Sequence, residues 1–89
     1  MRLVFTARSR AQYQKWVSGE ADGLRRANEL IKDAMRSPSS GIGKPEPLVG
    51  TLKGWWSRRI DREHRLVYRV SSHVPDQSLE ILACRLHCD

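Results

Sequence analysis

Residues 48–70 read LVGTLKGWWSRRIDREHRLVYRV, and polar and apolar side chains alternate along much of this stretch. A period of two is typical of β-strands that bury one face. Polar turns at 53–54 and 61–63 interrupt the alternation, which returns in SLEILACRLH at 78–87. We therefore predict antiparallel strands, joined by hairpins, over residues 48–52, 55–60, 64–70 and 78–87.

The chain before this stretch has a helical pattern instead. LVF at 3–5 reads as a short strand, and Ser9 with Gln12 resembles a capping box at the start of a first helix. The inner face of that helix carries Tyr13, Trp16 and Val17 at helical spacing.

A second predicted helix follows, with Asp22 as its candidate cap. Apolar residues recur at helical spacing on its inner face: Leu24, Ala27, Ile31 and Ala34. Basic residues occupy its other sides: Arg25, Arg26, Lys32 and Arg36. Such charges are typical of a solvated face, and a partner surface is the alternative.

Length and composition indicate one globular domain over residues 1–89, since 39% of the residues are hydrophobic. The order of the elements predicts an α+β fold. An N-terminal strand and two helices precede an antiparallel sheet of about four strands, and the helices pack on one sheet face. The proline- and glycine-containing segment SPSSGIGKPEP, residues 37–47, is the one long predicted loop, and such loops inside compact domains are commonly functional.

The chain is strongly basic, with a formal net charge of +6 and a pI near 10.0. A small basic domain attracts polyanions, which favours a nucleic-acid partner. No window is apolar enough to span a membrane, and the N-terminus lacks the apolar stretch of a signal peptide. We therefore expect a cytoplasmic protein that has no membrane partner.

The two cysteines, Cys84 and Cys88, lie four positions apart. On one extended strand they would be about 13 Å apart, too far for a disulfide. His87 would face away from both of them, so the three side chains would not converge on a metal ion. We expect no metal and no other cofactor.

Alternation also sorts the strand residues into two faces. Arg65, Val67 and Arg69 share a polar face, whereas His64 lies on the apolar face and reads as a structural histidine. In the last strand a second set shares one face: Leu79, Ile81, Ala83, Arg85 and His87. This pattern permits Arg59, Arg65 and His87 to meet on an open sheet face, with Glu46 entering from the loop.

These residue types suit metal-free RNA cleavage, in which a ribose 2′-hydroxyl attacks the adjacent phosphorus. That reaction needs a base, an acid and positive charge around the phosphorane. Glu46 fits the base and His87 the acid, because imidazole titrates near neutrality. Arg65 and Arg59 fit a phosphate, because guanidinium stays charged and binds in a bidentate manner.

Further residues are candidates for RNA contact. Lys44 can reach a phosphate as a point charge, and either Trp55 or Trp56 can stack on a base while the other belongs to the core. Arg58 and Cys88 are also candidates for RNA contact. The structural alternatives are a loop charge for Glu46, a solvent-facing strand residue for His87, and sheet-face ion pairs for Arg58 and Arg59.

Four motifs together resemble the YoeB (Txe) group of bacterial toxins in the RelE-like superfamily. They are GKPEPL at 43–48, GWWSRRI at 54–60, EHRLVY at 63–68 and ACRLH at 83–87. The resemblance covers nearly the whole chain. It implies a microbial-ribonuclease-like fold and a metal-free endoribonuclease that cleaves mRNA in the ribosomal A site.

The resemblance further implies a cognate YefM (Axe)-type antitoxin, a homodimer, and contact with operator DNA only through the antitoxin complex. The family's general base falls on Glu46, its phosphate-binding arginine on Arg65 with Arg59 assisting, and its general acid on His87. Lys44 lies in the matching loop. The group usually ends in Tyr-His-Tyr, so Cys88 replaces a tyrosine close to the active site and cannot stack.

Two other functions compete with the nuclease. A gyrase poison on the same fold has no use for Glu46, Arg65 and His87 together. A ribosome-binding inhibitor that does not cleave, or a co-repressor subunit, is favoured only by the altered end at Cys88.

Overall fold

The computed structural model describes residues 1–72 and 76–87, with side chains described as far as Arg85. Its elements follow in the order β1 (Arg2–Phe5), α1 (Ala7–Ser18), α2 (Ala21–Arg36), β2 (Glu46–Pro47), the 3-10 helix η1 (Gly50–Leu52), β3 (Trp56–Arg59), β4 (His64–Ser72) and β5 (Gln77–His87). None of the helices in the described ranges is long and apolar enough to cross a membrane.

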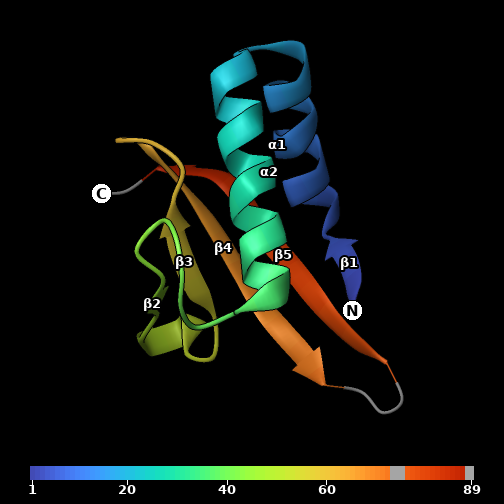
Figure 1. Cartoon of the computed structure of the whole chain (residues 1–89), viewed down its shortest axis with the longest axis vertical. Helices are drawn as coiled ribbons and strands as arrows, with labels where there is room; N and C mark the ends of the chain where they lie inside the picture. Colours follow the sequence, from blue (N-terminus) through green and yellow to red (C-terminus); the bar gives the residue numbers. More distant parts are fainter. Residues whose placement is uncertain (73–75, 88–89) are drawn as a thin grey trace.

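The strands form a five-stranded sheet in the order β1-β5-β4-β3-β2. β1 pairs with β5 in parallel, and the other neighbours are antiparallel. Both helices cover the same face of the sheet (Figure 1). We call the opposite side the open face. The predicted α+β architecture is confirmed.

Helix α1 begins earlier than the sequence predicts, because Thr6 rather than Ser9 caps it. The Thr6 side chain accepts a hydrogen bond from the Ser9 amide at 3.0 Å. Ser9 is buried inside the helix, and its hydroxyl donates to the Ile81 carbonyl at 2.7 Å. Trp16 is buried as predicted, whereas Val17 is 57% exposed, contrary to the prediction.

Helix α2 supplies the core face that its periodicity predicts. Its buried apolar side chains are Ala27, Leu30, Ile31 and Ala34. Its N-cap is Glu20, which makes no side-chain capping bond, so the predicted cap at Asp22 is wrong. Gly23 allows the two helices to approach, since a Cβ atom there would lie 2.1 Å from a carbon of the Trp16 ring.

The strand predicted over 48–52 is wrong. Gly50 has a φ of +71°, in the left-handed region that glycine adopts freely, and Gly50–Leu52 forms η1. Val49 is 85% exposed, so its apolar side chain does not hold this segment in the sheet. The strand that pairs with β3 lies just before it, at Glu46–Pro47, inside the predicted loop.

The register of β5 slips twice against β4. Tyr68 pairs with Ile81, Val67 with Ala83, and Arg65 with Leu86, so β5 carries an extra residue in each interval. Such bulges reverse the alternation of side chains. The predicted shared face is therefore wrong at Ala83.

Candidate active site

A carboxylate and two arginines lie together on the open face. Glu46 of β2 pairs with Ser57 of β3, and Arg59 of β3 pairs with Arg65 of β4. Cross-strand partners share a face, and so do Ser57 and Arg59, which are two residues apart. The alternate residues Trp56, Leu66 and Tyr68 pack in the core under the helices. Glu46, Arg59 and Arg65 therefore belong to two neighbouring cross-strand pairs on the sheet face that points away from the core.

Arg65 is held in place by a residue that the sequence did not single out. Its Nη1 donates to the Ser57 hydroxyl at 3.0 Å, and Ser57 is only 1% exposed. The Glu46 and Arg59 side chains are exposed, whereas Arg65 is half-buried. A buried hydroxyl thus fixes the guanidinium of Arg65 while its neighbours stay open to a ligand. The only sequence signal for Ser57 was its place two residues before Arg59 on the polar face.

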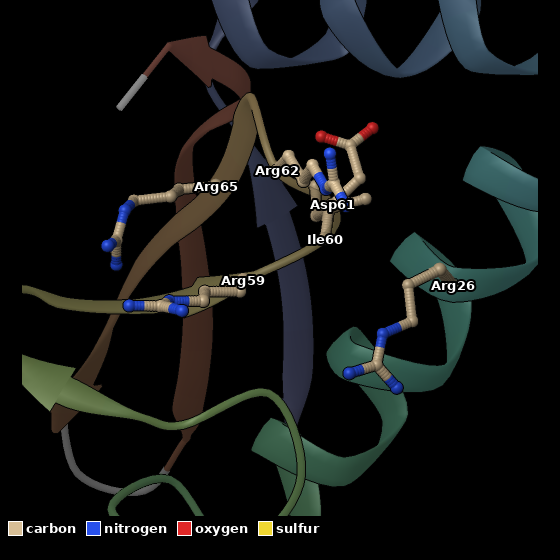
Figure 2. Close-up of a pocket in the computed structure, with 6 residues that line it drawn as sticks. All are labelled: Arg26, Arg59, Ile60, Asp61, Arg62 and Arg65. Atoms are coloured by element: carbon tan, nitrogen blue, oxygen red, sulfur yellow. The ribbon is translucent and has the colours of Figure 1, made fainter. Parts of the chain in front are cut away.

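Four arginines line one cavity at the end of β3 (Figure 2). They are Arg26 of α2 together with Arg59, Arg62 and Arg65, and the backbone turn contributes Ile60 and Asp61. Arg59 and Arg65 extend from one side of the turn and Arg26 approaches from the other (Figure 2). The sequence pattern places Arg26 only among the basic residues on the outer sides of the second helix.

Asp61 organises the β3–β4 turn. Its Oδ1 accepts the amides of Glu63 at 2.8 Å and His64 at 2.7 Å, and its carboxylate lies 3.1 Å from the His64 Nδ1. Partial burial opposes ionisation, but hydrogen bonds from the His64 side chain and the two amides lower the pKa of Asp61 overall. His64 also packs edge-on against Trp16, with ring centroids 5.1 Å apart. The structural role predicted for His64 is confirmed.

Arg58 is buried inside the protein and, contrary to the sequence interpretation, does not present its side chain to a ligand such as RNA. Its side chain is 0% exposed and pairs with Asp33 at 2.5 Å, while its Nε donates to the Tyr68 hydroxyl at 2.9 Å. The remaining donors bind carbonyls of the loop that leads to Glu46, at Ser37, Pro38, Ser40 and Ile42. Arg58 is therefore an internal anchor for this loop.

The anchor changes the ionisation of its carboxylate. The hydrogen bond from Arg58, followed by those from the Ile42 amide and the Arg36 side chain, lowers the pKa of Asp33 to about 2. Asp33 is thus charged at neutral pH, and the buried guanidinium has a counter-ion. Buried charges are tolerated when they are paired and hydrogen-bonded in this way.

The two tryptophans face opposite ways. Trp56 packs against the core, while Trp55 is half-buried and the Arg69 guanidinium lies 4.4 Å from its ring centroid. Arg69 is itself paired with Glu80 at 2.6 Å. Trp55 is therefore the tryptophan that lies outside the core, with the Arg69 guanidinium against its ring. Lys44 is exposed beside Glu46 and has a φ of +52°.

The predicted general acid, His87, is the last residue of β5. The backbone of His87 pairs with His64, and that of Leu86 pairs with Arg65. The side chain of His87 and the whole of Cys88 lie outside the described residues. The acid role of His87 and the RNA contact of Cys88 stay predictions. Within the described ranges there is no group of three side chains suited to hold a metal ion.

Two helices on one face of a five-stranded sheet in the order β1-β5-β4-β3-β2 match the RelE-like fold. YafQ from Escherichia coli shares this fold with a TM-score of 0.71 at 15% identity, over 97% of this chain and 93% of YafQ. At that identity the likeness concerns the fold alone.

The sequence assigns the chain to a narrower group than the fold does. Residues 5–88 match the model of the YoeB-like toxins of bacterial type II toxin–antitoxin systems, and the chain belongs to this family. Toxin YoeB of Escherichia coli K12 is 48% identical over 98% of this chain and 99% of the relative. Toxin YoeB of Streptomyces coelicolor is 45% identical over the same shares of the two chains.

Solved structures agree with this assignment. The YoeB/ParE toxin from Agrobacterium tumefaciens superposes with a TM-score of 0.93 at 48% identity, covering 99% of this chain and 100% of that one. The toxin of the YoeB–YefM complex from Staphylococcus aureus superposes with a TM-score of 0.86 at 34% identity, over 99% and 98%.

Proposed function

We propose that this toxin is a ribosome-dependent endoribonuclease that cleaves mRNA in the ribosomal A site without a metal. The observation that carries the proposal is the shared placement of Glu46, Arg59 and Arg65 on the open face of the sheet. Attack by a ribose 2′-hydroxyl requires a base and positive charge close together, and two neighbouring cross-strand pairs supply both.

Glu46 acts as the general base in this proposal. Its carboxylate takes the proton of the 2′-hydroxyl, and the resulting oxygen attacks the adjacent phosphorus. The bond from phosphorus to the 5′-oxygen then breaks, leaving a 2′,3′-cyclic phosphate on one fragment and a 5′-hydroxyl on the other. Glu46 is exposed on the two-residue strand β2, so an RNA chain can reach it directly.

Arg65 and Arg59 stabilise the charge that develops on the phosphorane. Arg65 is oriented before RNA binds, because the buried Ser57 hydroxyl accepts one of its N–H groups. Arg59 makes no ion pair with any residue in the described ranges, so its guanidinium is available to a phosphate. Fixed charges cost little reorganisation during the reaction, which is the basis of electrostatic catalysis.

His87 acts as the general acid that protonates the leaving 5′-oxygen. Imidazolium suits this step because its pKa lies near neutral pH. Its backbone lies next to that of Leu86, the partner of Arg65. Lys44, Trp55 and Cys88 lie on the RNA path in this proposal, as a phosphate contact, a stacking surface and a position that has lost an aromatic ring.

The proposed partners follow from charge and from relatives. A net charge of +6 suits mRNA, ribosomal RNA and the acidic segment of a YefM (Axe)-type antitoxin. The Staphylococcus aureus relative has been solved as a YoeB dimer and as a complex with YefM. We infer a homodimer and a YefM-type antitoxin for this chain, with operator DNA bound only through that complex.

The test is primer-extension mapping of mRNA ends in a reconstituted translation system. Wild type should produce new ends inside the A-site codon, only on ribosome-bound message, and Glu46→Ala and His87→Ala should produce none. Glu63→Ala, an exposed carboxylate in the β3–β4 turn, is the matched control and should cleave like wild type. Cleavage by both Glu46→Ala and His87→Ala would exclude the proposed acid–base pair.

Arg65→Lys is a separate prediction. It keeps the charge but removes the planar fork that binds one phosphate in a bidentate manner and also reaches Ser57. We expect cleavage to fall at least about tenfold, which corresponds to the loss of one charge-assisted hydrogen bond. Wild-type rates in the same primer-extension assay would make Arg65 an ordinary surface charge.

The register of β5 favours one alternative, an inhibitor that binds the ribosome or acts as a co-repressor without cleaving. His87 pairs with His64, which contacts Trp16 under the helices, rather than with Arg65. Inhibited translation without new mRNA ends would establish this alternative.

A further inference from the structure

We propose that the cavity lined by Arg26, Arg59, Arg62 and Arg65 binds a second phosphate of the same single-stranded RNA, next to the phosphate that is cleaved. We call it the arginine pocket. The inference rests on the proposed function, because two of its arginines also belong to the catalytic face. Arg26 and Arg62 are the residues that it adds, as binding residues rather than catalytic ones.

The pocket carries more positive charge than its own structure neutralises. Among the described residues that line it, the one carboxylate is Asp61, which is committed to two backbone amides and to His64. Arg59 and Arg62 make no ion pair with residues in the described parts of the chain. Like charges that are gathered in one concavity repel one another and attract an anion.

Arg26 is also largely available to a ligand. Its only carboxylate contact within the described residues is Glu29 at 3.8 Å, which is longer than a hydrogen bond, and that partner is 53% exposed. The Arg26 side chain itself is 37% exposed. An exposed pair of this kind contributes little, so a phosphate can replace Glu29 at small cost.

The position of the pocket favours RNA over other anions. It begins at Arg59 and Arg65 and continues past the turn to Arg26 on α2 (Figure 2). A chain whose scissile phosphate lies at the first two arginines must leave the site with its neighbouring phosphates close by. The cavity, at about 410 Å³, is large enough for a phosphate together with part of its sugar.

The test compares the pocket arginines with Arg25, which is next to Arg26 in the sequence. Arg26→Gln and Arg62→Gln remove a pocket charge but keep much of the aliphatic stem. Arg25→Gln is the matched control, since Arg25 lies on the same helix, is 72% exposed and does not line the pocket. Thermal unfolding of each variant verifies that the fold is retained.

Affinity is measured by fluorescence anisotropy with a short 2′-O-methyl RNA, which cannot be cleaved. We expect Arg26→Gln and Arg62→Gln each to raise Kd about tenfold and to reduce the slope of log K against log salt by about 0.7, the value for one lost phosphate contact. Arg25→Gln should change Kd less than about twofold, because an exposed charge outside the pocket contributes only through screened attraction. Arg26→Lys should keep most of the salt slope.

Equal behaviour of Arg25→Gln, Arg26→Gln and Arg62→Gln would overturn the inference, and so would a wild type that does not bind the RNA at low ionic strength. If the pocket variants lose affinity for a poly-glutamate peptide but not for RNA, the pocket is a protein-binding site and the inference is wrong. The probe does not need to be cleaved. A wild type that fails to cut mRNA while its Arg26 variant loses RNA affinity would refute the proposed function and leave this inference standing.

Discussion

One buried hydroxyl, that of Ser57, holds the guanidinium of Arg65, which we propose binds the phosphate. The hydroxyl is almost fully buried and accepts a guanidinium N–H at 3.0 Å. Arg65 is half-buried, and without this hydrogen bond its side chain would populate several rotamers. Fixing it before RNA arrives removes an entropy cost from the reaction.

Ser57→Ala tests this positioning role. We expect kcat to fall roughly fivefold, matching the loss of a hydrogen bond of about 1 kcal/mol, with little change in KM. Ser57→Thr, which keeps the hydroxyl, should restore most of the rate. Single-turnover cleavage in the reconstituted system measures both variants. A change in KM alone would mean that Ser57 acts only through packing.

Cys84 illustrates the opposite case, a reactive group made inert. Burial raises the pKa of its thiol to about 11, although the nearby Arg85 acts in the other direction. Only the thiolate reacts rapidly with alkylating reagents. In a Cys88→Ser variant, which leaves Cys84 as the single thiol, native protein at pH 8 should not react with iodoacetamide, whereas urea-unfolded protein should react completely. Rapid labelling of the native variant would contradict the buried placement.

At the scale of elements, the contact between α1 and α2 depends on a missing side chain. Trp16 lies directly over Gly23, and its indole N–H donates to the Cys84 carbonyl at 2.7 Å, so the ring has little freedom to move. Close packing makes even one added methyl group costly at such a position.

Gly23→Ala should therefore destabilise the protein, although alanine is the better helix former by about 1 kcal/mol. We expect the overpacking cost to exceed that gain and the free energy of unfolding to fall by roughly 1–2 kcal/mol. Urea unfolding followed by circular dichroism measures it. Lys32→Ala, an exposed position on the same helix, is the control and should change stability by less than about 0.5 kcal/mol. A more stable Gly23→Ala variant would show that the helices can separate at no cost.

The elements also show what local pattern can and cannot predict. Helix α2 follows its apolar period because one face meets the core along its whole length. The position of β2 was missed, since its pairing with β3 depends on a loop that the sequence shows only as irregular. The bulges in β5 are invisible to alternation because they are set by the partner strand. The sequence did contain a signal for the burial of Arg58. It lies two residues from both Trp56 and Ile60, so on a strand it shares their inward face despite its charge.

At the scale of the whole molecule, a buried ion pair joins layers that are far apart in the sequence. Asp33 of α2 and Arg58 of β3 meet between the helices and the sheet, and both hold the loop that precedes Glu46. Removing one member of a buried pair leaves the other uncompensated and is strongly destabilising. The stability of the domain and the placement of Glu46, the proposed general base, therefore depend on the same contact.

The pair makes the stability of the domain sensitive to acid. The pKa of Asp33 falls from 3.8 to about 2 on folding, chiefly through the hydrogen bond from Arg58. Because the unfolded state then binds protons more readily, this contribution is complete above about pH 4 and is lost as the pH falls towards 2. Urea midpoints measured between these limits should drop steeply for wild type. Asp33→Asn should be less stable at neutral pH and should lose less stability over the acid range, whereas Asp22→Asn, whose side chain is 97% exposed, should follow wild type. Parallel curves for wild type and Asp33→Asn would place the acid sensitivity elsewhere.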